Sequence, residues 1–532
     1  MNLRIFAFIS ALLVSAHAAG FEPLAARSKE PLLAYVRLPL PWEIGAAMSP
    51  EQQARLKAGL LPALLPADAM GRELRAFLER AGGPVEILVL EPFDKKVIPA
   101  PTLVIRGRHH SDKEDVLARL KNLFIAVLQV RSGQDMSWMA KAFKRSEGTK
   151  DVLVETVPFL LMRIRLEVGA EDYSFALSGD KDFQYATSGP GSGLDWAGLE
   201  KAWGGGMDDL VVYARPARAL EYYLPILQTV DPTSAKRLSD LGLHNLESLA
   251  LWTSGSLDKF FLGGEARFKK AGGAFTRFAK PGPKDAFPVQ AGAEFRGGLR
   301  LPQLGESDWR RLLAQFSPLE AAKAPAYARL LQSAGNSLSF SWAPHSPAPI
   351  IYLRPSDLSK FTGELENLLR PIAQVAHEKD GDANFTHILW QGSSLSLREE
   401  KGLVAFCPII HPLRDPMGKM AERSASQLLE VEYPQEGSQE QAYYASSLSL
   451  IQALVLKGQT VDPAMFPAFS RLKTQGASWK GTAQLKLTAE DNLWKLAWQQ
   501  PFGLPGLIGS CPADSAALVY FVTLFGLTLH SL

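Results

Sequence analysis

The chain has 532 residues, which is too long for one ordinary hydrophobic core and predicts about three or four domains. Its hydrophobic content of 46% and its charged content of 21% are those of a folded globular protein. The 57 Lys and Arg nearly balance the 55 Asp and Glu. The chain therefore lacks the basic excess of a nucleic-acid-binding protein, and we expect no nucleic acid among its partners.

The N-terminus has the pattern of an export signal. Arg4 supplies a positive charge, residues 5–14 are largely apolar, and Ala16 and Ala18 are the small residues that a signal peptidase requires. We predict a cleaved signal peptide over residues 1–18 and a location in the periplasm, the cell envelope or the extracellular space. About ten apolar residues cannot cross a hydrocarbon layer of about 30 Å, so we expect no transmembrane span beyond the signal peptide.

The first module is predicted from periodicity. β-prone runs at residues 32–37 and 85–90 flank a helical pattern at residues 50–80. Further strands are predicted at residues 102–106, 152–168 and 173–187.

A capping box opens the next helix of this module. Ser111 is the predicted cap and Glu114 its partner three residues on, before apolar side chains that recur at helical spacing from Val116 to Val127. The order β-α-β-β-α-β-β predicts an α+β fold, in which helices pack on one face of an antiparallel sheet.

The second module begins with residues 210–215, which resemble the first strand of the chain. Helices are predicted from Pro216 and from Pro232, and strands at residues 246–252 and 260–268. Gly- and Pro-rich runs outside these elements are predicted linkers, at residues 188–206 and 271–288.

One stretch of this module occurs twice. Residues 212–242, aligned without gaps on residues 443–473, share the run Gln-Thr-Val-Asp-Pro, at Gln228–Pro232 and Gln459–Pro463. The two stretches are identical at nine positions, where chance would give roughly two, and such self-similarity indicates duplication.

A second match precedes the first in both halves. Pro99–Pro101 and Pro347–Pro349 both read Pro-Ala-Pro and are followed by a β-prone run, a Ser-Asp pair and an amphipathic helix. In the second half the strands are predicted at residues 337–342, 386–397 and 402–408. We predict tandem duplication of a two-module unit, against the alternative of chance similarity. The predicted signal peptide and four modules span residues 1–18, 19–190, 207–280, 289–430 and 438–532.

Motifs for catalysis are absent from the sequence. It contains no H-E-x-x-H, G-x-S-x-G, P-loop or C-x-x-C pattern, so we predict no catalytic residue, cofactor or metal ion. His109 and His110 precede a helix cap and are interpreted as solvated turn residues. Because triads assemble from distant residues, an enzyme is not excluded.

The densest polar cluster covers residues 377–384, with His387 nearby. Asp380, Asp382 and Asn384 alternate as in a calcium loop, but Gly and Glu are missing from the positions where such a loop needs them. We therefore interpret the cluster as a turn between a helix and a strand.

Cys407 and Cys511 are the two cysteines of the chain and form a candidate disulfide in an oxidising compartment. The alternative is two buried thiols that never meet, because spacing alone does not give geometry. The apolar run at residues 516–529 is too short for a membrane span. We predict a buried closing segment there, with a peripheral membrane contact as the alternative.

The strands that contain Tyr, the helices after them and a recurrent Pro-Ala-Asp, at Pro66–Asp68 and Pro512–Asp514, carry one resemblance. The mature chain resembles large secreted bacterial proteins of unknown function built from repeated α+β modules. That resemblance implies no activity. We expect a non-enzymatic binding or scaffold protein with an unknown envelope partner. The alternatives are a carrier of lipid or another apolar ligand, and a hydrolase with a dispersed site.

Overall fold

The computed structural model describes residues 32–38, 69–91, 101–146, 152–159, 162–178, 210–240, 242–255, 260–269, 285–301, 303–316, 324–343, 346, 348–390, 393–415, 418–438, 478–490 and 492–500. Several predictions concern residues outside this part of the chain. They are the signal peptide, the first linker, the second copy of the repeat and the apolar C-terminal run, at residues 1–18, 188–206, 443–473 and 516–529.

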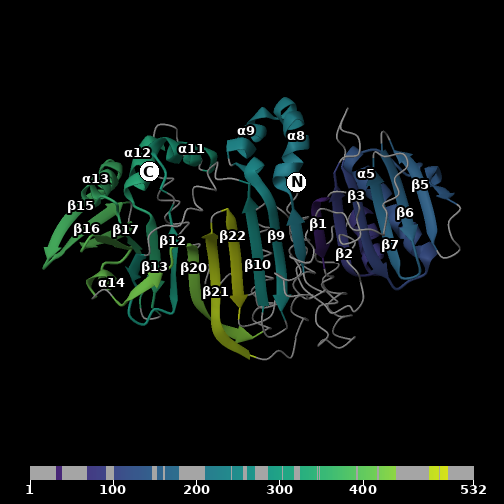
Figure 1. Ribbon diagram of the computed structural model, residues 1–532. Coiled ribbons are helices and arrows are strands. Elements are labelled where there is room, and N and C mark those ends of the chain that lie inside the picture. Colours follow the sequence, from purple (N-terminus) through teal and green to yellow (C-terminus); the bar gives the residue numbers. More distant parts are fainter. Residues whose placement is uncertain are drawn as a thin grey trace.

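Twenty strands of the described chain form one sheet, and each of their pairings is antiparallel (Figure 1). We call residues 32–269 the first arm and residues 285–500 the second arm. The first arm contributes β1 (Leu32–Leu38), β2 (Ala81–Leu90), β3 (Thr102–His109), β4 (Lys144–Ser146), β5 (Leu153–Phe159), β6 (Met162–Val168), β7 (Asp172–Ser178), β8 (Val211–Ala214), β9 (Leu246–Gly255) and β10 (Phe260–Phe268). The second contributes β12 (Phe295–Arg300), β13 (Ser337–Trp342), β14 (Ile350–Leu353), β15 (Gln374–Asp380), β16 (Ala383–Trp390), β17 (Ser393–Glu400), β18 (Leu403–Cys407), β20 (Gln427–Ser438), β21 (Ser478–Glu490) and β22 (Leu493–Gln500).

The arms meet where β10 pairs with β22. Outward from this pair the first arm runs β10-β9-β8-β1-β2-β3-β7-β6-β5-β4. The second arm runs β22-β21-β20-β12-β13-β14-β18-β17-β16-β15. Within the described chain, β4 and β15 are therefore the outer strands. A separate ribbon consists of β11 (Asp285–Pro288) and β19 (Met420–Arg423), so β11 lies inside the predicted second linker.

The helices connect these strands. In the first arm they are α4 (Ala69–Leu78), α5 (Lys113–Ser132), α6 (Met139–Ala142), α8 (Pro216–Val230), α9 (Pro232–Asp240) and the 3-10 helix η2 (Leu243–Asn245). In the second they are α11 (Glu306–Phe316), α12 (Ala324–Ser333), α13 (Leu358–Leu369) and α14 (His411–Arg414). The prediction of an antiparallel sheet with helices is confirmed.

Two prolines define the start of α8 and α9. Pro216 and Pro232 each occupy the first turn, where a missing N–H costs nothing and a fixed φ suits the helix, and both predictions are confirmed. Gly242 follows α9 with φ 75°, a left-handed conformation that glycine adopts readily. The chain then turns through η2 into β9.

The core of the first arm lies between its sheet and α4 and α5. Val116 and Leu117 of α5 pack with Phe77 of α4 against Ile164 and Leu166 of the sheet. The opposite face of the same sheet has a second apolar cluster, which includes Tyr35, Leu88, Val104 and Trp252. Along the strands, the residues of this cluster alternate with those that face the helices. Both faces of this sheet are thus buried.

The second arm differs from the prediction of helices on a single face. Phe361 of α13 packs on Phe406, whereas Leu413 of α14 packs with Cys407 in a cluster on the other face. Neighbouring residues of β18 point to opposite faces, so the two helices sandwich this strand.

Two strand predictions were wrong in their boundaries. Residues 152–168 form the hairpin β5–β6, in which Val157 lies opposite Ile164, because the same alternation continues through both strands. Residues 386–397 belong to two strands, β16 and β17, and β15 was not predicted because six of its seven side chains are exposed. An exposed strand lacks the apolar alternation that identifies a half-buried one.

Candidate functional site

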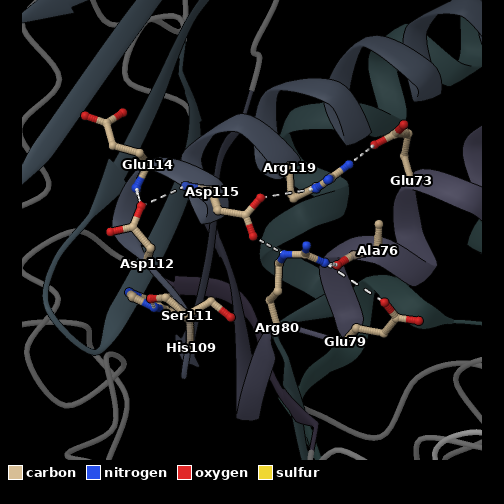
Figure 2. Close-up of polar contacts among 10 residues, drawn as sticks. All are labelled: Glu73, Ala76, Glu79, Arg80, His109, Ser111, Asp112, Glu114, Asp115 and Arg119. Carbon is tan, nitrogen blue, oxygen red and sulfur yellow. Dashed lines mark hydrogen bonds and ion pairs between the residues drawn. The ribbon is translucent and has the colours of Figure 1, made fainter.

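A polar network joins α4 to the first turn of α5 (Figure 2). Asp115 binds the Arg80 guanidinium through Oδ2 and lies 3.5 Å from Nε of Arg119 through Oδ1. Arg119 Nη1 in turn lies 3.8 Å from Oε2 of Glu73, and Arg80 Nη1 donates to the Ala76 carbonyl at 2.7 Å. The network therefore clamps the end of one helix to the start of the next.

The electrostatics of this network oppose proton transfer. The hydrogen bond from Arg80 lowers the pKa of Asp115, and the hydrogen bond from Arg145 lowers the pKa of Glu114. Carboxylates held in the charged form by arginines are poor general acids at neutral pH. We assign the network a structural role.

The cap of α5 lies one residue beyond its predicted position. Asp112, not Ser111, accepts from the backbone N–H of Glu114 at 3.0 Å and of Asp115 at 3.4 Å. Asp357 caps α13 in the same way through the N–H of Lys360. Either residue of a Ser-Asp pair can cap a helix, so the sequence left the choice open.

The interpretation of His109 as a solvated residue was wrong, whereas His110 is exposed as predicted. The buried His109 ring lies between two carbonyl oxygens, with Nδ1 2.9 Å from Ser111 O and Nε2 3.1 Å from Gly169 O. The turn between β6 and β7 packs over the end of β3 and covers this ring. His109 ties that turn to the start of α5.

A buried polar group on the other face of the first arm was not predicted. Tyr35 donates to Oε1 of Glu86 at 2.6 Å, and Oε2 of Glu86 lies 3.9 Å from Nη1 of Arg106. Both Tyr35 and Glu86 are fully buried, and burial raises the pKa of the Tyr35 hydroxyl. A Glu between Val85 and Ile87 in an apolar strand was the signal that could have indicated it.

The β15–β16 hairpin divides the predicted polar cluster between two faces. Oε1 of Glu378 accepts from Arg414 at 2.8 Å, and its Oε2 lies 3.2 Å from Nε2 of His387. The hydrogen bond from Arg414 lowers the pKa of Glu378. His377, the neighbour of Glu378, points the other way and lies 3.6 Å from Oε1 of Glu366 on α13.

Glu399 has a raised pKa, whereas the other carboxyls of the described chain with a shifted pKa have a lowered one. Burial raises its pKa, and the nearby Glu366 carboxylate raises it further. His377, whose Nδ1 lies 3.3 Å from Thr386 Oγ1, faces the same group. A carboxyl with a raised pKa beside a histidine and a second carboxylate is a combination used in acid–base catalysis.

The predicted calcium-like spacing has a simpler explanation. Asp380 pairs with Ala383, so Gly381 and Asp382 are the two residues of a tight hairpin turn, with φ 58° at Gly381. This turn joins two strands, not a helix and a strand as we interpreted it. Over the described ranges no group of three or more His, Cys, Asp or Glu could hold a metal ion.

The candidate disulfide stays a prediction. Cys407 is buried in β18, and burial raises the pKa of its thiol to about 11, whereas Cys511 lies outside the described residues. As for the membrane, the described helices include none that is long and apolar enough to span a bilayer.

Comparison with known proteins gives little. No protein-family model matches the chain, and no curated protein matches it. Solved structures of crystal forms III, I and IV of the protein TP0453 are similar at 9%, 10% and 8% identity, with TM-scores of 0.25, 0.26 and 0.23. The matches cover 49%, 49% and 47% of this chain and 86%, 85% and 81% of the TP0453 chains. Similarity at this level carries no argument about fold or function.

Proposed function

We propose that the chain is an exported, non-enzymatic binding or scaffold protein of the bacterial cell envelope. The single sheet carries this proposal, because the β10–β22 pairing unites both arms in one extended platform. The arginine–carboxylate clusters support it, since they tie helices and turns to that platform. The predicted signal peptide at residues 1–18 supplies the export, and the partner is an unknown envelope component.

We also propose that the arms arose by duplication of the predicted modules. The strand order in space supports this. Strands at the same distance from the β10–β22 pair are counterparts in the two arms. Each pair of counterparts also holds the same place in the sequence order of its arm. For example, the counterparts β1 and β12 are each the first strand of their arm in the sequence. In both arms the strand after Pro-Ala-Pro is followed by a helix with an Asp cap, Asp112 or Asp357.

The test uses the full chain in a bacterial host. We expect a mature chain that begins at Ala19 in the periplasmic or envelope fraction, measured by intact mass. Photo-cross-linking from position 379 on the outer strand β15 should give one discrete product with an envelope component. A chain that stays in the cytoplasm with its first 18 residues attached, or that gives no discrete product, would contradict the proposal.

A hydrolase with a dispersed site is a second candidate, favoured by the raised pKa of Glu399 beside His377 and Glu366. In that case Glu399→Gln abolishes hydrolysis of chromogenic esters or glycosides and leaves the cross-linked product unchanged. If the wild-type chain hydrolyses none of these substrates at a rate above that of Glu399→Gln, this candidate is removed.

A further inference from the structure

The last turns of α5 and the turn after it expose apolar side chains. Trp138 is 60% exposed, Val130 is 53% exposed and Val127 is 36% exposed. The two valines lie on the last turns of α5, and Trp138 lies six residues beyond its end. Isolated exposed apolar residues are ordinary, but an exposed Trp a few residues after two exposed valines needs an explanation.

The turn that carries Trp138 is pinned on its N-terminal side. Gly133 ends α5 in the left-handed conformation and donates its N–H to Gln129 O at 2.9 Å. Oδ1 of Asp135 accepts from Nε2 of Gln129 and from the N–H of Ser137, both at 2.9 Å. These bonds hold the turn against the last turn of α5, which also carries Val130.

The turn is anchored on its other side by the core. Met139, the residue after Trp138, is buried between the helix and the sheet, and Phe143 packs edge-on against Phe124 at 6.4 Å. Trp138 therefore lies between the hydrogen bonds of Asp135 and the buried Met139, yet its own side chain is exposed to solvent. A rigid turn of this kind holds the indole outward instead of letting it fold back.

The turn at residues 133–144 carries two lysines and one acid, Asp135, whose hydrogen-bond partners Gln129 and Ser137 are neutral. Lys141, one helical turn after Trp138, and Lys144 on β4 are both exposed. The neighbouring acids are engaged, because Glu114 binds Arg145 and Glu155 binds Lys121. The turn therefore offers an exposed indole on a short stretch with two exposed lysines and a net positive charge.

We propose that the turn at residues 133–144 is a membrane-surface anchor, which places Trp138 among the headgroups of an anionic bilayer. Indole rings and lysine side chains both favour this interface, where the ring meets acyl chains and the ammonium group meets phosphate. A stable protein interface needs about 800 Å² on each partner, far more than one Trp and two valines supply. Reversible membrane binding needs only a small apolar insertion together with basic charge.

The test is flotation of the purified full chain with vesicles of phosphatidylcholine, with and without phosphatidylglycerol. We expect binding to the mixed vesicles and its loss in roughly 1 M salt. Trp138→Ala should lower the partition coefficient about tenfold, and Lys141→Ala with Lys144→Ala should lower it about fivefold per lysine. Leu389→Ala is the matched control, because Leu389 is 51% exposed on the second arm, and it should bind as the wild type does.

Three results would overturn the proposal. They are a wild-type chain that binds neither vesicle, a Trp138→Ala variant that binds as well as the wild type, and a Leu389→Ala variant that loses as much as Trp138→Ala. Circular dichroism checks that each variant is folded. Because Trp138 and both lysines are exposed, we expect their spectra to match that of the wild type.

Discussion

The two arms join a pair of neighbouring helices through different ion pairs. In the first arm Arg80, Arg119, Asp115 and Glu73 form a network between α4 and α5. In the second arm α12 and α13 are joined through Arg329, whose Nε lies 3.1 and 3.2 Å from the two Glu364 oxygens. Apolar packing is common to both arms, whereas the ion pairs differ. Packing therefore sets the helix positions, and the ion pairs adjust them.

The arms also differ in where they bury charge. The first arm buries Glu86 and Tyr35 within its sheet. The second buries Arg423, which reaches from the β11–β19 ribbon to both oxygens of Asp285, at 3.0 and 2.7 Å, and to the Ser337 hydroxyl of β13. The Arg423 guanidinium also lies 5.3 Å from the Phe287 ring. A buried charge thus holds the β11–β19 ribbon on the sheet of the second arm.

The largest effect is expected from Arg423→Met. The substitution removes the guanidinium that is hydrogen-bonded to the mostly buried Asp285 carboxylate, so the free energy of unfolding should fall by about 3–5 kcal/mol. Urea unfolding gives the loss, and hydrogen exchange should confine it to the second arm. Arg296→Met is the control. The arginine of the Arg296–Glu432 ion pair is exposed, so this pair should contribute less than about 1 kcal/mol to the free energy of unfolding. Equal losses in the two variants would refute the contrast.

A cavity in the first arm should cost less. Leu117 is buried in the core beneath α5, so Leu117→Ala should lower the free energy of unfolding by about 3 kcal/mol. Val127 lies on the same helix with its side chain exposed, and Val127→Ala should change stability by less than about 0.5 kcal/mol. A large effect of Val127→Ala would mean that this face of α5 is covered.

The two arms should respond alike to the loss of a helix cap. Asp112→Ala and Asp357→Ala each remove the acceptor for backbone N–H groups, and each should cost about 1 kcal/mol. Thermal unfolding of the single and double variants measures this, and the two effects should add because the caps lie in different arms. A negligible effect in one arm alone would show that its cap is dispensable.

The smallest expected effect depends on pH. The Arg80 hydrogen bond lowers the folded-state pKa of Asp115, so its contribution is present above the unfolded pKa of about 3.9 and is lost as pH falls through the lower folded value. Asp115→Asn should cost less than about 1 kcal/mol at pH 7, because the group is partly exposed, and almost nothing near pH 2. An equal cost at both pH values would rule out the ion pair as the cause.

Local patterns predicted part of this fold, and long-range contacts account for the rest. Pro216 and Pro232 gave the starts of two helices because proline acts within one turn. The Ser-Asp pairs placed α5 and α13 to within a residue, since a cap is a local interaction. The pairing of Asp285 with Arg423, 138 residues apart, could not be predicted, because the two meet only when β11 and β19 pair in the folded chain.

In the candidate site, too, local patterns could be predicted and long-range contacts could not. The cluster at residues 377–384 was recognised from its polar composition, but its separation onto two faces depends on a strand that carries no apolar alternation. The contacts of Glu378 with Arg414 and of His377 with Glu366 form only because β15 directs these neighbouring side chains to opposite faces.

The central claim is that both arms belong to one sheet through β10 and β22. It is tested by a disulfide between Glu265→Cys and Lys495→Cys, which lie directly opposite each other in that pairing, in a chain whose Cys407 and Cys511 are replaced by serine. Opposite positions have Cβ atoms about 4.5–5.5 Å apart, close enough for oxidation to join them with a small shift of the backbone. We predict an intramolecular disulfide, detected by peptide mass mapping, and none in the mismatched pair Glu265→Cys with Gln499→Cys. Equal cross-linking of the two pairs, or links between molecules only, would contradict the account.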